Sequence, residues 1–348
     1  MRILYLGKNQ DNFYAAEWYY MLRWLAKTQD FHVHGPTLAG PSSLLKYVNV
    51  DRLGRLMAPF SNLTGHLSGI VRSSIETDIV KVCRQVEPEV IFIDSFFPPS
   101  PAWRNLVEVD IPKAILVSDP HYMLREKLQY ITRNHVDLCL FDHKFVMDLK
   151  LFHSWRSRNE AVALGWLPHC VNTEVFRDYA FSRTIDVASS GSTVQSIYPL
   201  RYKIMTELQR VTDFKFVMPP HARYDMARGK AASGALIRDN YAKFLAHSKI
   251  FIFDSSIYNY ALMKYTEGMA CKSLVMAPTP HDAENLHFIA GENFVEVNEA
   301  NFLNKIRYYL RHEEERNEIS ENGMNTVLKY HTLEKRCEEL VTYLGALL

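Results

Sequence analysis

The sequence lacks several features that mark specialised classes of protein. Apolar runs stay well short of the ~18 residues that a membrane-spanning helix needs, and the run in residues 1–7 is too short for a signal peptide. Cysteines are few and odd in number, with no Cys-x-x-Cys pair and no histidine at zinc spacing. We therefore expect a cytoplasmic protein with reduced thiols and no metal site. The five cysteines are Cys83, Cys139, Cys170, Cys271 and Cys337.

An excess of charge of either sign is also missing. Lys and Arg number 40 against 39 Asp and Glu, a formal net charge of +1, so a nucleic-acid partner gains no overall electrostatic support. The chain contains no Gly-x-Gly-x-x-Gly after a strand and no Walker-type phosphate loop, which removes the main signals of dinucleotide enzymes and ATPases. It also contains no Asp-x-Asp, which favours chemistry that is independent of a metal ion.

The length and the hydrophobic pattern predict two α/β domains. A chain of 348 residues, 47% of them hydrophobic, is long enough for two cores. Short apolar runs that end at Gly, Asp, Ser or Pro are typical of buried parallel strands, and helix-period stretches such as 13–27 and 74–85 separate them. In the first half, the expected strands are Ile3–Leu6, Phe31–His34, Val90–Ile93, Ala114–Val117, Leu138–Phe141 and Ala161–Leu164.

The alternation of apolar runs and helix-period stretches breaks at residues 165–169, where we place a domain boundary, and then resumes. This pattern gives an N-terminal domain at 1–168, a C-terminal domain at 169–330, and a terminal helix at 331–348 that packs back on the first domain. Expected strands of the second domain are Ile185–Ala188, Phe214–Met218, Ile250–Phe253, Leu274–Met276 and Phe294–Val297. Expected helices are Pro199–Arg210, Leu262–Cys271 and Asn301–Leu310, followed by helix from about Glu313 with a break near Tyr330.

Polar residues follow the ends of these strands. Because ligands bind at the carboxyl ends of strands in such sheets, we expect the function to lie in a cleft between the two domains. The strand-end segments are Gly7-Lys-Asn, Asp94-Ser95, Ser118-Asp-Pro-His121, Asp142-His143, Ser189-Ser-Gly-Ser192, Pro219-Pro-His221 and Asp254-Ser-Ser256.

The segment from Ile250 to Pro278 carries a family resemblance. A strand ends at Asp254-Ser-Ser256, a helix bearing Glu267 follows, and a Val-containing strand comes at once. This order resembles the GT-B glycosyltransferases, most closely the CgeB-type spore-maturation branch of the retaining group 1 family. The connector Gly165–Phe176, the stretch Asp186–Arg201 and the ending Asn322–Arg336 are similar to the same branch. The resemblance is best over residues 135–340, while the first 110 residues match only in their alternation of strands and helices.

The resemblance implies a GT-B fold, with two Rossmann-like domains facing a central cleft, and transfer of a sugar from a nucleotide-diphosphosugar, UDP- or GDP-linked, without a further cofactor. It assigns Glu267 to the ribose hydroxyls of the donor. The sequence departs from the family where Asn259 replaces the glutamate that the family often has eight positions before Glu267, and where Lys272 replaces a glycine. Lys264, one helix turn before Glu267, is placed in the same nucleotide-sugar site; the alternative for Glu267 is a solvated pair with Lys264.

Further site residues follow from position and resemblance. Amides of Gly191 and Ser192 and the guanidinium of Arg201 are expected at the diphosphate, where fixed donors stabilise a leaving group. His121 matches a family histidine that touches the donor sugar, and a packed imidazole is the alternative. Asp119 is expected to act as a base or a hydroxyl acceptor, or else to cap a turn. The remaining assignments are Asn259 and Tyr260 to the sugar and His221 to the border of the nucleotide.

Other functions stay open from the sequence. Among enzymes, the alternatives to this prediction are a GT-B sugar-nucleotide epimerase and a phage-type base glucosyltransferase, which share the architecture. The alternative that is not an enzyme is a non-catalytic sugar- or nucleotide-binding protein. The acceptor is a glycan, a lipid-linked molecule or a small molecule. The aromatic helix at 13–27 suggests contact with a membrane surface, but it carries few cations, and packing on the sheet is the favoured interpretation.

Overall fold

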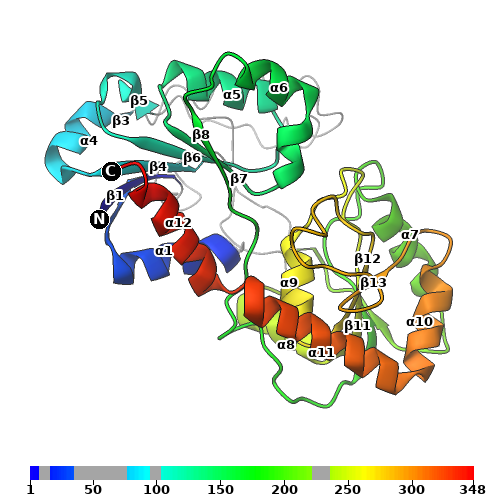
Figure 1. The fold of residues 1–348 in the computed structure, drawn as a ribbon. Coiled ribbons are helices and arrows are strands. Elements are labelled where there is room, and N and C mark those ends of the chain that lie inside the picture. Colours follow the sequence, from blue (N-terminus) through cyan, green and yellow to red (C-terminus); the bar gives the residue numbers. More distant parts are fainter. Residues whose placement is uncertain (8–15, 35–76, 95–102, 222–235) are drawn as a thin grey trace, which may run out of the picture.

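Two parallel β-sheets, one in each lobe, organise the protein (Figure 1). The computed structural model describes residues 1–7, 16–34, 77–94, 103–221 and 236–348. Several sequence predictions lie outside the described residues, namely the polar turn after Gly7, the start of the helix expected at 74–85, and Ser95.

The first sheet has the strand order β2-β1-β4-β6-β7-β8, with every neighbouring pair parallel. Its strands are β1 (Arg2–Leu6), β2 (Asp30–His34), β4 (Val90–Asp94), β6 (Lys113–Val117), β7 (Leu138–Phe141) and β8 (Ala163–Trp166). Its helices are α1 (Ala16–Thr28), α4 (Ile79–Val86), α5 (Leu124–Arg133) and α6 (Lys150–Arg156), with 3₁₀ turns η2 (Leu106–Glu108) and η3 (Lys144–Asp148) and a small pair β3 (Thr77–Asp78) and β5 (Trp103–Arg104).

Side chains of successive strand residues enter two different cores, one on each face of this sheet. Along β1, Leu4 and Leu6 pack with α4, α5 and α6, whereas Ile3 and Tyr5 pack with α1. Alternate residues point to opposite faces of a strand, so a strand covered on both faces must be apolar throughout. The predicted strands are therefore confirmed, with β8 displaced by two residues toward the carboxyl end; helices α5 and α6 were not predicted.

The second sheet has the order β10-β9-β11-β12-β13 and is also parallel. Its strands are β9 (Ile185–Ala188), β10 (Phe216–Val217), β11 (Ser248–Ile252), β12 (Leu274–Ala277) and β13 (Val295–Glu296). Each falls on or beside a predicted run. The helices are α7 (Pro199–Leu208), α8 (Arg238–Ala246), α9 (Met263–Ala270) and α10 (Phe302–Arg311); α8 was not predicted.

The last two helices link the lobes. Helix α11 (Glu313–Tyr330) packs on α9 and β12 in the second lobe, and α12 (Leu333–Gly345) packs on α1 in the first (Figure 1). The break between them lies at His331, as expected, and Thr332 caps α12 through its side chain. Leu340 and Leu344 of α12 share a core with Leu25 of α1. The chain therefore passes between the lobes twice, once after β8 and once at His331.

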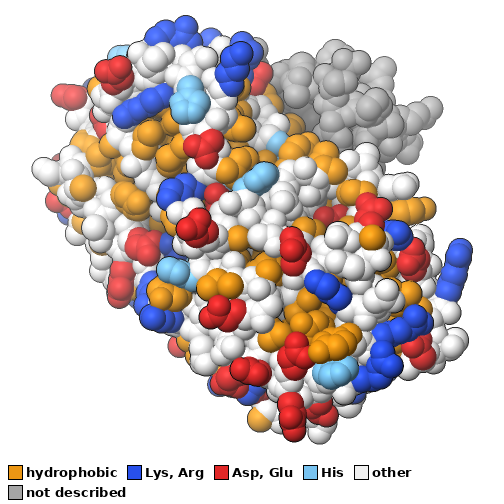
Figure 2. Space-filling view, turned by 45° about the vertical axis from the view of Figure 1, so that its right-hand side comes forward, with side chains coloured by type: hydrophobic (Ala, Val, Ile, Leu, Met, Phe, Trp, Pro, Cys, Tyr) orange, Lys and Arg blue, Asp and Glu red, His pale blue; other side chains and the backbone are white. Residues whose placement is uncertain are grey.

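The surface carries both signs of charge. On the face in Figure 2, Lys and Arg side chains lie among Asp and Glu side chains, in keeping with the formal net charge of +1. Within the described ranges, no helix combines the length and the apolar character needed to traverse a bilayer.

Candidate functional site

The loop after β6 presents His121 toward the second lobe. The strand stops at Val117, and Pro120 prevents its continuation, while Asp119 adopts a left-handed backbone (φ 47°) that aspartate tolerates. Lys127 of α5 is fully buried and donates from Nζ to the carbonyl oxygens of Ser118 and Asp119, the latter at 3.2 Å. Burial lowers the pKa of Lys127. Lys127 therefore fixes the backbone of this loop through two hydrogen bonds.

His121 meets Tyr260 of the second lobe directly. The backbone N–H of His121 donates to Tyr260 Oη at 3.1 Å, and its Nδ1 lies 2.7 Å from the same oxygen. Burial lowers the pKa of His121 and raises that of Tyr260, so both side chains are neutral at pH 7. The arrangement that uses the phenolic proton is O–H···Nδ1, which leaves Nε2 protonated as a donor.

Aromatic stacking extends this contact. Tyr258 stacks on His121 with ring centroids 4.1 Å apart, and Tyr260 stacks on His143 at 4.2 Å. Two tyrosines of one lobe are thus interleaved with two histidines of the other. His143, one of the strand-end residues, is buried, and the ring stacked on it belongs to a residue expected at the sugar.

Asn259 has a different environment from the one expected for a sugar ligand. Its φ of 54° is left-handed, its Nδ2 donates to the Thr279 carbonyl at 2.8 Å, and its Oδ1 accepts from Ser255 Oγ at 2.7 Å. Asparagine tolerates this backbone better than most residues. Both ends of the amide are therefore engaged in shaping the loop that carries Tyr258 and Tyr260.

Glu267 and Lys264 lie on α9, which begins just after that loop. Glu267 is 8% exposed, so a solvated surface pair with Lys264 does not describe it. Burial raises the pKa of Glu267 to about 7, while Lys264 opposes the rise. Burial, together with the charge of Arg201, lowers the pKa of Lys264 to about 8, while Glu267 opposes the fall. Strongly shifted groups of opposite charge near a strand end are typical of ligand sites.

Arg201 supports the loop expected at the diphosphate. Its guanidinium is 2% exposed and donates to the Ser192 carbonyl at 3.0 Å and to the Asp254 carbonyl at 2.5 Å. Gly191 has φ +108°, and a Cβ there would lie 2.7 Å from Arg201 Nη1 and 3.1 Å from Lys264 Cε. Glycine is required by the backbone and by this close approach. The structure thus brings Gly191, Ser192, Arg201 and Lys264 together, with the Nη atoms of Arg201 directed at backbone carbonyls.

His221, expected at the border of the nucleotide, lies at the end of a described range. It is half-buried and follows β10, directly before the segment 222–235 that lies outside the described residues.

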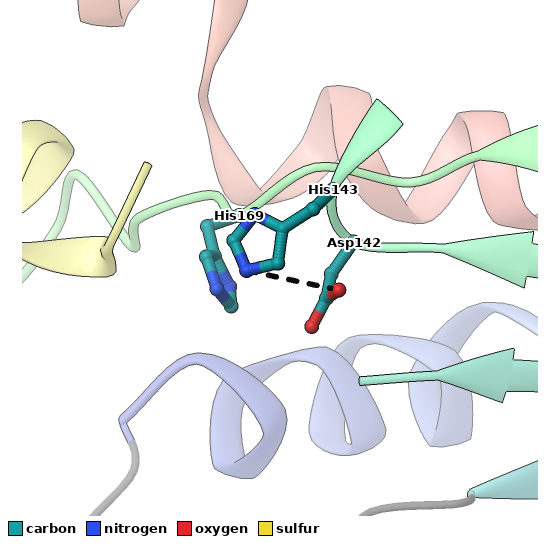
Figure 3. Close-up of side chains that lie close together, drawn as sticks. All are labelled: Asp142, His143 and His169. Atoms are coloured by element: carbon teal, nitrogen blue, oxygen red, sulfur yellow. Dashed lines mark ion pairs between the residues drawn. The ribbon is translucent and has the colours of Figure 1, made fainter. Parts of the chain in front are cut away.

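A second cluster joins the end of β7 to the connector between the lobes. Asp142 and His143 follow β7, and His169 lies in the connector; their side chains come together beside α1 (Figure 3). The Nδ1 atom of His169 lies 2.8 Å from Oε2 of Glu17, and Glu17 Oε1 accepts from the Cys170 amide at 2.8 Å. Burial alone would lower the pKa of His169, but the Glu17 carboxylate raises it to about 9.

Sequence reasoning missed most of this cluster. The strand-end position of Asp142 and His143 was a signal, and His169 belongs to the family-like connector. Glu17 carried no such signal, because the interpretation of its helix depended on the aromatic residues. Burial raises the pKa of Asp142 to about 7, and its Oδ1 has no hydrogen-bond partner among the described residues. A buried acceptor left without a partner costs about 1–3 kcal/mol.

Comparison with solved structures identifies the fold. A glycosyltransferase from Rickettsia africae aligns at a TM-score of 0.65 with 13% identity, over 99% of this chain and 98% of that one. Sucrose-phosphate synthase from Thermosynechococcus elongatus aligns at 0.66 and 12%, over 100% and 99%. Anabaena Alr3699/HepE in complex with UDP-glucose aligns at 0.64 and 12%, over 99% and 100%. The fold of this protein is that of the GT-B glycosyltransferases.

Sequence comparison adds a more local finding. No curated protein matches this chain. Residues 201–342 match the family described as glycosyl transferase-like, a range that begins at Arg201 and contains Lys264 and Glu267. The chain thus combines the GT-B fold over both lobes with a stretch, residues 201–342, that is similar in sequence to the glycosyl transferase-like family.

Proposed function

We propose that this protein is a glycosyltransferase that moves a sugar from a nucleotide-diphosphosugar, UDP- or GDP-linked, to a hydroxyl of a glycan, a lipid-linked acceptor or a small molecule. The observation that carries the proposal is the family match over 201–342, because it covers α9 with its buried Glu267 and with Lys264, whose pKa burial lowers to about 8. The fold adds support, since Anabaena HepE, with the same fold, has been crystallised with UDP and with UDP-glucose.

The donor's nucleotide half is assigned to the second lobe. Glu267 accepts hydrogen bonds from the ribose hydroxyls. Lys264 and the amides of Gly191 and Ser192 face the diphosphate, and Arg201 holds this loop in place through its bonds to Ser192 and Asp254. When the bond from the anomeric carbon to the diphosphate breaks, negative charge grows on the leaving group, and fixed donors stabilise it without a divalent ion.

The sugar half is assigned to the residues where the lobes meet. The Tyr260 hydroxyl occupies Nδ1 of His121, so the ring carries its proton on Nε2 and donates it in a hydrogen bond to a sugar hydroxyl. Asp119, two residues away, takes the proton that leaves the acceptor hydroxyl as the new glycosidic bond forms, or holds a sugar hydroxyl. On the CgeB-type resemblance we extend the proposal to transfer with retention at the anomeric carbon. The five buried free thiols agree with a reducing compartment, so the proposed location is the cytoplasm.

Titration with UDP, GDP, ADP and TDP, followed by thermal shift and calorimetry, tests the nucleotide site, because a ligand that binds the native state stabilises it. One of these diphosphates should bind selectively, and Glu267→Ala should weaken it by about 1–3 kcal/mol, since ribose hydroxyls lose their acceptor. Glu318→Ala, an exposed glutamate of α11, is the matched control. Equal affinity in Glu267→Ala and wild type for all four diphosphates would remove Glu267 from the site.

Turnover separates an enzyme from a binding protein. We expect slow hydrolysis of the preferred nucleotide sugar when the acceptor is left out, and binding without any hydrolysis or transfer would favour the non-catalytic rival. Diphosphate affinity and turnover should be the same with and without added Mg²⁺ or Mn²⁺. Activity that appears only after one of these ions is added would contradict metal independence of the donor site.

A further inference from the structure

The cluster at the end of β7 has the composition and geometry of a metal site. Asp142, His143 and His169 each offer one ligand atom, and these atoms lie within 4.8 Å of one another (Figure 3). The Asp142 Oδ1 to His143 Nε2 distance is 3.8 Å, close to the ~3.4 Å between two ligands of a tetrahedral ion with bonds of ~2.1 Å. Small side-chain movements would therefore bring the ligands to bonding distance.

The buried atoms of this cluster point to a missing partner. Asp142 is 6% exposed and His143 2%, and neither Asp142 Oδ1 nor His143 Nδ1 has a hydrogen-bond partner in the described parts of the chain. The approach of His143 Nε2 to Asp142 Oδ1 is too long for a hydrogen bond. A cation at the centre would satisfy the carboxylate oxygen that the protein leaves unsatisfied.

Glu17 provides the arrangement that supports a metal-binding histidine. Its carboxylate accepts a hydrogen bond from His169 Nδ1, so Nε2 is the nitrogen left to bind an ion. The Cys170 amide donates to the other carboxylate oxygen and fixes the carboxylate in turn. A carboxylate behind a histidine ligand orients the ring and raises its basicity. Carboxyl ligands bind a metal in the deprotonated form, so Asp142, with Glu17 behind His169, would set two carboxylates against the charge of a divalent ion.

We propose that Asp142, His143 and His169 bind a divalent transition-metal ion, with Zn²⁺ as the best match to two imidazoles and one carboxylate. Zinc with three protein ligands keeps one further position. A small cavity lined by Asp142, His169, Ser118 and Glu17 lies beside the cluster and accommodates a water molecule there. The ion ties the connector, through His169, to the end of β7 in the first sheet.

Binding of an ion here can be tested apart from the proposed sugar transfer, although His143 also stacks on Tyr260. Its ligands come from the first lobe and the connector, whereas the diphosphate is assigned to Lys264 and the loop at Gly191. Absence of a metal here would leave the proposed transfer intact, and a failure of nucleotide binding would leave the metal site standing. Cysteine spacing gave no hint of it, because the ligands are two adjacent residues and a third 26 positions after His143.

Calorimetric titration of the chelator-treated protein with ZnCl₂ tests the proposal. We expect one equivalent to bind to the wild type, at least about tenfold weaker binding to Asp142→Asn, and about 10- to 100-fold weaker binding to Glu17→Gln. Asp148→Asn and His153→Gln are matched controls, because both residues are exposed and lie between His143 and His169 in sequence. They should bind as the wild type does.

Wild-type affinity in Asp142→Asn, or binding lost equally in the controls, would overturn the proposal. If Asp142→Asn does not fold by circular dichroism, Co²⁺ titration of the wild type decides. Intense visible absorption of a tetrahedral Co²⁺ site that Zn²⁺ abolishes supports the assignment. The weak spectrum of Co²⁺ in water, unchanged by the protein, refutes it.

Discussion

At the scale of single residues, the contact between His121 and Tyr260 joins the two lobes through side-chain hydrogen bonds. The Tyr260 hydroxyl serves both the backbone amide and Nδ1 of His121. The phenol therefore positions the imidazole and sets which nitrogen carries its proton. A residue that acts in this way affects chemistry more than binding of the bare nucleotide.

Replacing Tyr260 with Phe tests this role. The variant keeps the ring stacked on His143 but leaves Nδ1 and the amide of His121 without a partner, so we expect the rate of sugar transfer to fall about tenfold. Affinity for the nucleoside diphosphate should hardly change, and the pH profile of the rate should shift as His121 loses its fixed proton position. His121→Ala should give the same pattern with a larger loss.

Tyr258→Phe is the matched control, since its ring stacks on His121 and stacking survives the change. Transfer kinetics beside calorimetry with the diphosphate measure both quantities. Equal losses of rate and affinity in Tyr260→Phe would assign Tyr260 to nucleotide binding or folding instead.

The shifted pKa of Glu267 predicts how stability depends on pH. A glutamate whose pKa rises from 4.5 unfolded to about 7 folded holds its proton more tightly in the native state. Its contribution to stability is fully present below pH 4.5 and is lost as pH rises through 7. Glu267→Gln imitates the protonated form, so the difference in Tm between this variant and the wild type should grow from pH 5 to pH 8.

Calorimetric melting at pH 5, 6, 7 and 8 measures that difference. The exposed Glu318→Gln should show a constant, small difference across the series. A flat series for Glu267→Gln would mean that the carboxyl titrates near its ordinary value.

At the scale of elements, the approach of α11 to the second sheet depends on a glycine. A Cβ on Gly323 would lie 2.7 Å from the backbone oxygen of Asn293, which cannot move aside as a flexible side chain does. Helix α11 packs closely on α9 and β12. The position of α9, and with it that of Glu267, therefore rests partly on this close contact.

Gly323→Ala should destabilise the protein by about 1–3 kcal/mol, because the helix must move away from the sheet. Gly345→Ala is the control, since that helical glycine has nothing within 4 Å of its Cβ position, and alanine there should be neutral or stabilising by up to about 1 kcal/mol. Urea unfolding followed by circular dichroism measures both changes. Equal stability of the two variants would show that α11 adapts at no cost.

At the scale of the whole molecule, the lobes are held against each other by a buried carboxylate as well as by the aromatic contacts. Asp282 of the second lobe accepts hydrogen bonds from the backbone amides of Lys144 and Phe145 at 2.8 and 3.1 Å. These residues form the start of η3, which follows the metal-site candidate directly. Relative movement of the lobes must break these bonds.

Asp282→Ala should increase the population of molecules with separated lobes, since two part-buried amides lose their acceptor, at a cost of about 1–3 kcal/mol in all. Small-angle X-ray scattering should report a larger radius of gyration than in the wild type. Asp213→Ala, which removes an exposed ion pair within the second lobe, should leave the radius unchanged. Equal radii for Asp282→Ala and the wild type would place the closing force elsewhere, foremost in the interleaved rings.

The sequence predicted the elements better than the contacts of the site. The strands were found because a parallel strand covered on both faces needs an unbroken apolar run, a local property. Helices α6 and α8 were missed because they are short, with seven and nine residues, whereas Leu124, Leu128 and Ile131 of α5 recur at helical spacing and made that helix predictable. Asn259 and Arg201 were predicted as ligand contacts from their positions in a motif, but the structure engages their polar groups with neighbouring backbone and side chains.

What the sequence determined by itself is the alternation of strands and helices and the polar residues at strand ends, both of which follow from neighbours within a few positions. Tertiary structure alone decided that Tyr260 meets His121 and that Glu17 lies behind His169. Those contacts join residues 139 and 152 positions apart in the chain. Which side chains meet there depends on how two sheets and a crossing helix pack, and packing is a property of the whole core.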